Sequence, residues 1–242
     1  MTDRIVRVLD TFTADRTTQT ATEIAQRAAL PSSTAHRIVA DLVEAGLLEK
    51  DEDARIRLGM RLWELALRGS RALRLRQAAL PHMETVQARI REHTQLAVLE
   101  HEEALFLERL SHPDAGANIT RIAGRLPLHA SSSGLVLLAF ADPEVRERVL
   151  AGPLRAVSPE TVTDPAALRR LLTSIRRRGH VVAPGTVEAV STGIAVPVRD
   201  RGEVVAALSV VLPREAPPQA AIEALLEAAR RIEADLRRGE SR

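Results

Sequence analysis

The stretch PSSTAHRIVADLVEAGLL, residues 31–48, decides the fold of the first part of the chain. Its opening proline and serines are typical of a helix start, with Ser32 or Ser33 expected as the N-cap. The helix is expected to run to about Ala45 and to stop at Gly46. Its apolar residues recur at helical spacing and predict one buried stripe of Ala35, Ile38, Val39, Leu42 and Val43.

The opposite stripe of this helix is polar at its N-terminal end. Its members are Ser33, His36, Arg37, Ala40 and Glu44. A solvated surface is the ordinary interpretation of such a face. Short hydroxyl side chains beside one arginine and one histidine, at the helix end that favours phosphate, instead favour contact with nucleic acid.

The flanking segments place this helix third in a small domain. Residues 5–12 show apolar spacing of a first helix, and Thr20 and Glu23 have the spacing of a capping box that opens a second. After the third helix, residues 47–58 read as a short hairpin with an acidic turn. Three helices followed by a hairpin predict a winged helix-turn-helix, whose second motif helix enters the major groove of DNA.

The chain beyond residue 60 changes from helical to mixed patterns. A helical connector begins at Arg61, and Pro81 is expected to open a further helix that ends near Thr94. Residues 95–110 read as a hairpin, 128–141 as a buried helix and 164–178 as an arginine-rich helix. A second hairpin is expected over residues 193–213, and a closing helix from Pro217 onward. This order predicts an α+β domain whose antiparallel sheet is covered by helices on at least one side.

Composition limits the class of protein. The 242 residues are 45% hydrophobic and 2% aromatic, and they contain no cysteine. Disulfides and thiolate zinc sites are therefore excluded, and the seven histidines form no metal-binding spacing, so neither a metal nor another cofactor is expected. We find no apolar run long enough for a membrane span and no signal-peptide layout at the N-terminus, which indicates a cytoplasmic protein without membrane partners.

Charge is a weaker guide to nucleic-acid binding. The sequence pI is near 10.1, yet the formal net charge is only +2. Residues 1–70 carry ten basic and eleven acidic side chains, so placement must matter more than net charge. The acidic wing tip, Asp51 to Asp53, would repel a phosphate backbone. The candidate DNA-contacting residues are Thr22, Ser32, Ser33, Thr34, His36, Arg37, Arg55 and Arg57.

Several segments together resemble one protein family. TATEIAQRAALPSSTAHRIVADLVEAGLLEKD, with the following IRLG, is similar to the DNA-binding domain of the IclR family of bacterial transcriptional regulators. RLPLHASSSGLVLLA, RRRGHVV and GIAVPVRDRGEVVAALSVVLP resemble three successive segments of that family's effector-binding domain, in the expected order. The resemblance extends from about Arg4 to Arg238.

The resemblance implies a domain organisation for the chain. Residues 1–60 would form the winged helix-turn-helix DNA-binding domain, 61–78 a connector helix, and 79–242 a GAF-like effector-binding and oligomerisation domain. Family members bind a double-stranded DNA operator as a homodimer, commonly a dimer of dimers. Their effectors are small organic acids or aromatic breakdown products.

The resemblance also implies the ligand-binding positions, which are Leu126, Leu128, Ser132, Ser133, Ala183, Gly193, Ser209 and Val211. Ser132 and Ser133 fall where backbone amides at a helix start meet an anionic ligand. Ala183, Gly193 and Val211 depart from the family's polar contacts. This departure favours a bulkier, more apolar ligand, or none.

Two other classes of function compete with an effector-controlled regulator. A DNA-binding protein without a small-molecule ligand would share the first domain. An enzyme is disfavoured, because His129 and the serines 131–133 are adjacent in sequence without the G-x-S-x-G pattern of a nucleophile elbow.

Overall fold

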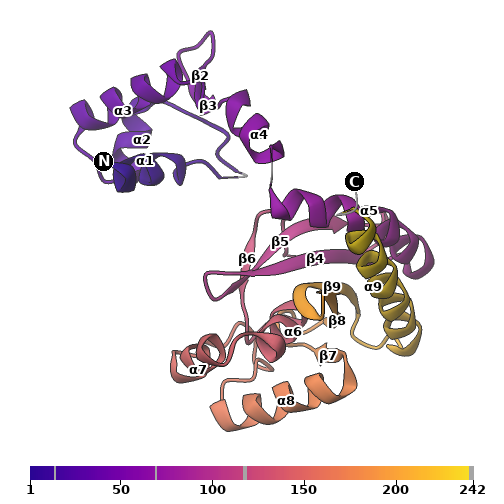
Figure 1. Cartoon of the computed structure of the whole chain (residues 1–242). Helices are drawn as coiled ribbons and strands as arrows, with labels where there is room; N and C mark the ends of the chain where they lie inside the picture. Colours follow the sequence, from indigo (N-terminus) through magenta and orange to yellow (C-terminus); the bar gives the residue numbers. More distant parts are fainter. Residues whose placement is uncertain (14, 69, 117–118, 240–242) are drawn as a thin grey trace. The chain divides into compact units, whose positions relative to one another are not determined.

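The computed structural model describes residues 1–13, 15–68, 70–116 and 119–239. The chain forms two compact units, Met1–Leu73 and Arg74–Arg242 (Figure 1). The helix α5 begins in the first unit and continues in the second. Within the described residues, no helix is long and apolar enough to cross a membrane.

The first unit is a winged helix-turn-helix, as the sequence predicts. Its sheet has the strand order β1-β3-β2. The elements are α1 (Thr2–Leu9), β1 (Thr18–Gln19), α2 (Ala21–Arg27), α3 (Ser32–Glu44), β2 (Leu48–Lys50), β3 (Ile56–Leu58) and α4 (Met60–Leu67). The strand β1, which pairs with β3, was not expected, because its sequence is wholly polar.

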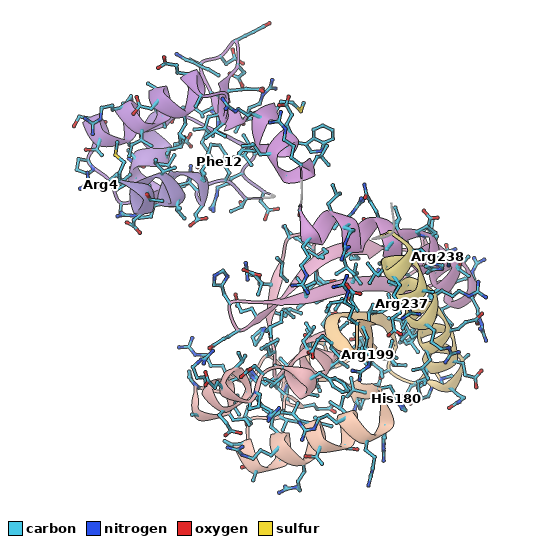
Figure 2. The ribbon with its side chains drawn as sticks, viewed as in Figure 1. Arg4, Phe12, His180, Arg199, Arg237 and Arg238 are labelled. Carbon is cyan, nitrogen blue, oxygen red and sulfur yellow. The ribbon has the colours of Figure 1, made fainter. Side chains whose placement is uncertain are left out.

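The core of the first unit confirms the apolar stripe of α3. Ala35, Ile38, Val39 and Leu42 are buried against α1, α2 and the wing, while Val43 is only partly buried. Phe12 packs against the same core from the segment after α1 (Figure 2). Alternation of buried and exposed faces at the helical period therefore fixes which side chains of α3 remain outside.

The capping predictions for this unit have two different outcomes. Thr20 and Glu23 form the expected capping box, with the Glu23 amide donating to the Thr20 hydroxyl at 3.2 Å. The expected serine N-cap of α3 was wrong, because Pro31 occupies that position and makes no side-chain cap. Ser32 is already helical, so its hydroxyl remains on the exposed helix end.

The connector consists of two helices, α4 and α5 (Arg71–Ile90). Pro81 lies inside α5, so the prediction that it opens a new helix was wrong. A proline costs the helix one backbone hydrogen bond. Buried side chains before and after Pro81 hold the helix against the second unit's core, namely Leu75, Ala79, Met83 and Val86.

The second unit contains one antiparallel sheet of order β6-β5-β4-β9-β8-β7. The strands are β4 (His93–Glu100), β5 (Glu103–Leu110), β6 (Arg125–Pro127), β7 (Val181–Pro184), β8 (Ser191–Asp200) and β9 (Glu203–Pro213). The helices beyond α5 are α6 (Ser132–Phe140), α7 (Pro143–Ala151), α8 (Pro165–Arg178) and α9 (Gln219–Gly239). The predicted hairpins and the helices α6, α8 and α9 are confirmed, whereas α7, β6 and β7 were not anticipated.

The sheet separates two apolar cores. One face packs against α5 and α9, which lie side by side (Figure 1). The other face packs against α6, whose residues are all buried except the partly buried Phe140, with α7 and α8 outside it. The α+β prediction is confirmed, and the arrangement places the first turn of α6 over the middle of the sheet.

Candidate functional site

The exposed face of α3 carries the polar residues singled out in the sequence. Ser33, His36 and Arg37 are all exposed. Within the described part of the chain, Arg37 makes no hydrogen bond or ion pair, so its guanidinium keeps all its donors. Nδ1 of His36 donates to the Ser32 carbonyl at 2.8 Å, which makes Nε2 an acceptor when the ring is neutral.

The remaining helix residues of the predicted DNA set lie in the first turns of α2 and α3. Thr22 is exposed in the first turn of α2, and Ser32 is exposed in the first turn of α3. Thr34 is half-buried between the exposed and buried stripes. The two helices of the motif therefore bring short hydroxyl side chains to their N-terminal ends.

The two wing arginines are held by partners within the first unit. Arg55 donates to the Thr18 carbonyl at 3.2 Å and lies 3.8 Å from Glu23. Arg57 pairs with Glu49 at 3.0 Å. Both guanidiniums would have to share or leave these partners to meet a phosphate. Asp51 accepts the Arg55 amide at 2.8 Å, so this acidic residue builds the turn of the wing.

A cavity opens in the second unit between the sheet, the first turn of α6 and two loops. It contains about 400 Å³ of space, its open mouth included. Its walls are formed by Gln95, Phe106, Ile119, Thr120, Leu126, Ser131, Ser132, Ser133, Ala183, Thr186, Val187, Glu188, Ser191, Gly193 and Val211. All six strands of the sheet, the helix α6 and two loops thus contribute to its walls.

The first turn of α6 supplies the electropositive part of the cavity. Ser131 caps the helix by accepting the Gly134 amide at 3.0 Å. The amides of Ser132 and Ser133 belong to the first turn, where no helical carbonyl accepts them, and the helix dipole adds partial positive charge. This end of the cavity is suited to a carboxylate.

Gly193 allows α6 to approach the sheet closely. A Cβ atom on Gly193 would lie 2.6 Å from the Ser132 hydroxyl oxygen, closer than any real contact. The sequence departure at this position therefore does more than remove a polar group. It creates the space that the first residue of α6 occupies against β8.

Buried polar side chains form a hydrogen-bonded chain along the cavity floor. Ser133 donates to the Ser209 hydroxyl at 2.8 Å, and Ser209 in turn lies 3.5 Å from the Gln95 side-chain oxygen. The Gln95 amide nitrogen donates to the Thr120 hydroxyl at 2.5 Å. The chain joins α6, two strands and the loop before β6, so polar groups line a site that its aliphatic residues alone would leave apolar.

Six of the eight predicted ligand positions lie in the cavity wall: Leu126, Ser132, Ser133, Ala183, Gly193 and Val211. The other two are placed elsewhere. Leu128 is buried in the core beside α6, and Ser209 lies beneath the wall as the partner of Ser133.

Sequence reasoning missed most of the polar wall, namely Gln95, Thr120, Ser131, Thr186, Glu188 and Ser191. Glu188 is the one ionisable side chain among the described lining residues, so no side-chain cation faces a bound anion. The signal for Gln95 was its position in an otherwise buried strand, where a polar residue requires a partner.

His129 is used structurally, not beside a serine nucleophile. It is 5% exposed, and its Nε2 donates to the Arg155 carbonyl at 2.9 Å. The hydroxyl of Ser131 caps α6, and that of Ser133 is bonded to Ser209. The arrangement lacks the nucleophile–base contact that acyl-transfer chemistry requires, within the residues that the structure describes.

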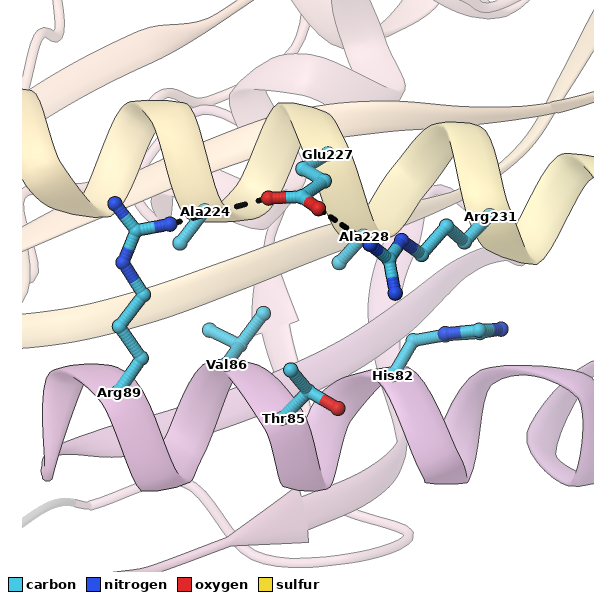
Figure 3. Close-up of a pocket in the computed structure, with 8 residues that line it drawn as sticks. All are labelled: His82, Thr85, Val86, Arg89, Ala224, Glu227, Ala228 and Arg231. Carbon is cyan, nitrogen blue, oxygen red and sulfur yellow. Dashed lines mark hydrogen bonds and ion pairs between the residues drawn. The ribbon is translucent and has the colours of Figure 1, made fainter.

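A second hollow lies between α5 and α9, away from these residues (Figure 3). The methyl groups of Val86, Ala224 and Ala228 form its floor, with Arg89 at one end and His82 at the other. Its charges are paired, because Arg231 lies 2.6 Å from Glu227. We interpret this hollow as part of the α5–α9 packing.

His82 joins the two helices at this hollow by a hydrogen bond to Asp235 of 2.7 Å. That bond lowers the pKa of Asp235 below its ordinary value, and the charge of Arg238 adds to the effect. Arg89 lies near Glu223 and Glu227 at the other end of the contact. The second half of α5 is therefore tied to α9 at both ends of the hollow.

Comparison with known families matches both units. A family model described as "Bacterial transcriptional regulator IclR C-terminal" matches residues 70–236, and one described as "IclR helix-turn-helix domain" matches residues 2–52.

Curated relatives are similar over most of the chain. The HTH-type transcriptional regulator BhcR of Paracoccus denitrificans (strain Pd 1222) is 31% identical over 240 residues, covering 95% of this chain and 85% of BhcR. The HTH-type transcriptional regulator XynR of Escherichia coli (strain K12) is 29% identical over 210 residues, covering 86% of this chain and 83% of XynR.

A solved structure is similar at a higher level of identity. It is the crystal structure of an IclR homologue from Microbacterium hydrocarbonoxydans complexed with 4-hydroxybenzoate. The two chains are 66% identical, with a TM-score of 0.95 and 98% of each chain covered.

Proposed function

Because the chain belongs to the IclR family of bacterial transcriptional regulators, we propose that it binds a DNA operator. In this proposal, its affinity for the operator changes when a small organic acid binds in its cavity. In this proposal, residues 1–60 bind DNA, 61–78 connect, and 79–242 bind the effector and oligomerise. Such a regulator would act in the cytoplasm, where bacterial DNA lies.

The DNA-binding part is supported by the exposed N-terminal end of α3. Arg37 has its donors available and lies one helical turn from Ser33 on the exposed stripe. An arginine in this position can donate two hydrogen bonds to guanine in the major groove. Phosphates or base edges around Arg37 would be contacted by Thr22, Ser32, Ser33, Thr34 and His36. The two wing arginines, Arg55 and Arg57, would contact phosphate only while sharing their guanidinium groups with Glu23 and Glu49.

The cavity is the observation that carries the effector proposal. Its wall combines the open amides of α6 with apolar side chains such as Phe106 and Leu126. A carboxylate at the helix end and an aromatic ring against the apolar wall would use both features. The Microbacterium relative, with its bound 4-hydroxybenzoate, supports an aromatic acid as the effector class.

We further propose that the protein is a homodimer whose subunits meet through α4, and that two dimers associate. Met60 and Trp63 of this helix are 62% and 61% exposed, and α4 buries none of its residues. With Leu67 they form an apolar stripe at helical spacing. Sedimentation equilibrium of the Trp63→Glu variant tests this contact, because a charge in the stripe should lower the association state.

The experiment that tests the effector proposal is calorimetric titration with 4-hydroxybenzoate, repeated with benzoate and with small aliphatic acids. Binding should also raise the melting temperature, since a ligand of the folded state stabilises it by mass action. DNA selected by the protein from a random pool would supply the operator for parallel titrations.

If no acid in this panel binds, the effector proposal fails and a ligand-independent DNA-binding regulator becomes the better description. Failure to enrich any DNA sequence would instead contradict the operator proposal. The two outcomes are independent, because the α3 face and the cavity belong to different units.

A further inference from the structure

Strand β5 contains a bulge that reverses the facing of the residues after it. Leu96 of β4 pairs with Glu108, whereas the next residue, Ala97, pairs with Phe106. Leu107 is therefore an extra residue without a partner of its own. Strict alternation from Phe106, which faces the cavity, would send Glu108 to the cavity as well.

The bulge instead turns Glu108 to the face that packs against α5 and α9. The side chain of Glu108 is 4% exposed, and one of its oxygens lies 2.5 Å from a guanidinium nitrogen of Arg76 on α5. Its other oxygen accepts the backbone amide of Arg109 at 2.9 Å. A buried carboxylate needs such partners, so the strand and the helix are joined at this point.

The neighbouring residues of β5 form part of the cavity or hold its wall. Phe106 lines the cavity directly. Arg109, which pairs with Gln95 in the sheet, donates through its guanidinium to the carbonyl oxygen of Thr120. Gln95 and Thr120 are themselves lining residues and are hydrogen-bonded to each other.

Four consecutive residues thus touch both sides of the sheet. Phe106 and Arg109 reach the cavity wall, and Glu108 between them reaches the helix that continues into the first unit. A ligand that shifts Phe106 or Thr120 must move the backbone that carries Glu108, because interiors are close-packed. Arg76 must then follow or lose a buried partner.

We propose that Glu108 and Arg76 are the positioning residues through which occupation of the cavity acts on α5. This inference rests on the proposed function, because it presumes an effector in the cavity and a DNA response in the first unit. The pair touches no ligand. Its role is to make the position of α5 depend on the state of β5, a coupling between two sites.

The test uses the full chain, 4-hydroxybenzoate as the probe, and the variant Glu108→Gln. Glutamine keeps the shape of the side chain but removes the buried charge, and Arg76, whose side chain is 40% exposed, can be solvated. The double variant Arg76→Gln/Glu108→Gln guards against a folding defect caused by one unpaired partner. Asp200→Asn is the matched control, because Arg74 of α5 pairs with this carboxylate at 3.3 Å away from the cavity wall.

Three quantities are measured for each protein: calorimetric affinity for 4-hydroxybenzoate, amide hydrogen exchange in residues 71–80 with and without it, and affinity for the operator. In the wild type and in Asp200→Asn, the ligand should change exchange in this segment. In both Glu108 variants the ligand should bind with little change in affinity, while the exchange response disappears. Operator affinity, which coupled ligands typically change about 5- to 150-fold, should become insensitive to the ligand in parallel.

An exchange response that persists in both Glu108 variants overturns the inference, as does its loss in Asp200→Asn, which would show a general effect of α5 anchoring. Absence of ligand binding to the wild type overturns the effector proposal, and the coupling inference falls with it. Ligand binding to the wild type with no response in α5 overturns the coupling alone.

Discussion

The hydroxyl of Ser133 donates a hydrogen bond of 2.8 Å to the hydroxyl of Ser209, joining the first turn of α6 to strand β9. Both side chains are buried, with 1% and 0% of their surfaces exposed. The bond holds the amide-bearing end of α6 against the sheet. It also links the predicted ligand contact Ser133 to the hydrogen-bonded chain that continues through Gln95 to Thr120.

Replacing Ser209 with alanine should lower the free energy of unfolding by about 1 to 3 kcal/mol, because the Ser133 hydroxyl loses its buried partner. Urea unfolding measures this change. Ser33 is exposed and its side chain makes no hydrogen bond within the residues that the structure describes, so Ser33→Ala serves as the control and should unfold like the wild type. Equal stability of the two variants would contradict a structural role for the bond.

Replacing Gly193 with alanine should displace the first turn of α6, since the new Cβ would meet the Ser132 hydroxyl at 2.6 Å. We expect a stability loss of about 1 to 3 kcal/mol, typical of an overpacked site. We also expect weaker binding of 4-hydroxybenzoate in calorimetric titration. Gly116→Ala is the matched control, because a Cβ there would have nothing within 4 Å. Unchanged ligand affinity in Gly193→Ala would place the ligand away from Ser132.

Replacing Arg37 with alanine should weaken operator binding by about 1 to 3 kcal/mol and relax the sequence preference at one base pair, as expected for a bidentate guanine contact. Gel-shift titration on DNA enriched from a random pool measures both effects. Arg57→Ala provides the comparison, because Arg57 is already paired with Glu49 and should contribute less. A larger loss in Arg57→Ala than in Arg37→Ala would move the main contact from α3 to the wing.

Replacing Asp235 with asparagine should destabilise the protein at neutral pH and matter little in acid. The hydrogen bond from His82 lowers the pKa of Asp235 in the folded state, below an unfolded value of about 3.9. Its contribution is therefore complete above that value and is lost as the pH falls through the folded pKa. Urea unfolding of both proteins at several pH values measures the difference, which should shrink on acidification. A difference that grows in acid would contradict this assignment.

Periodicity in the sequence was sufficient for most of the fold. The apolar stripe of α3, the two long hairpins and the closing helix α9 all follow from residues repeating at the helical or strand period. Pro81 misled the prediction because local rules place a proline at a helix start, whereas tertiary packing of Leu75 and Met83 carries α5 through it. Sequence patterns are local, whereas contacts between residues distant in the sequence determined that α5 continues through Pro81.

Only part of the cavity lining could be predicted from the sequence, for a related reason. Ser132 and Ser133 were predicted because the family resemblance places them at a helix start, where backbone amides can meet an anionic ligand. Gln95 and Thr120 reach the cavity from a strand and a loop, and nothing in their neighbours marks that direction. The bulge at Leu107 is a property of the pairing of β4 with β5, so the facing of Glu108 could not be derived from β5 alone.

The exposed tryptophan of α4 has a practical consequence. Trp63 is the single tryptophan of a chain that has no tyrosine, and it is 61% exposed. Intrinsic ultraviolet fluorescence therefore comes almost wholly from the first unit. Trp63 does not line the cavity, so an emission change on adding an effector would report on α4 and its surroundings. Trp63 is thus an intrinsic fluorescent probe in α4, the helix that follows the wing in the sequence.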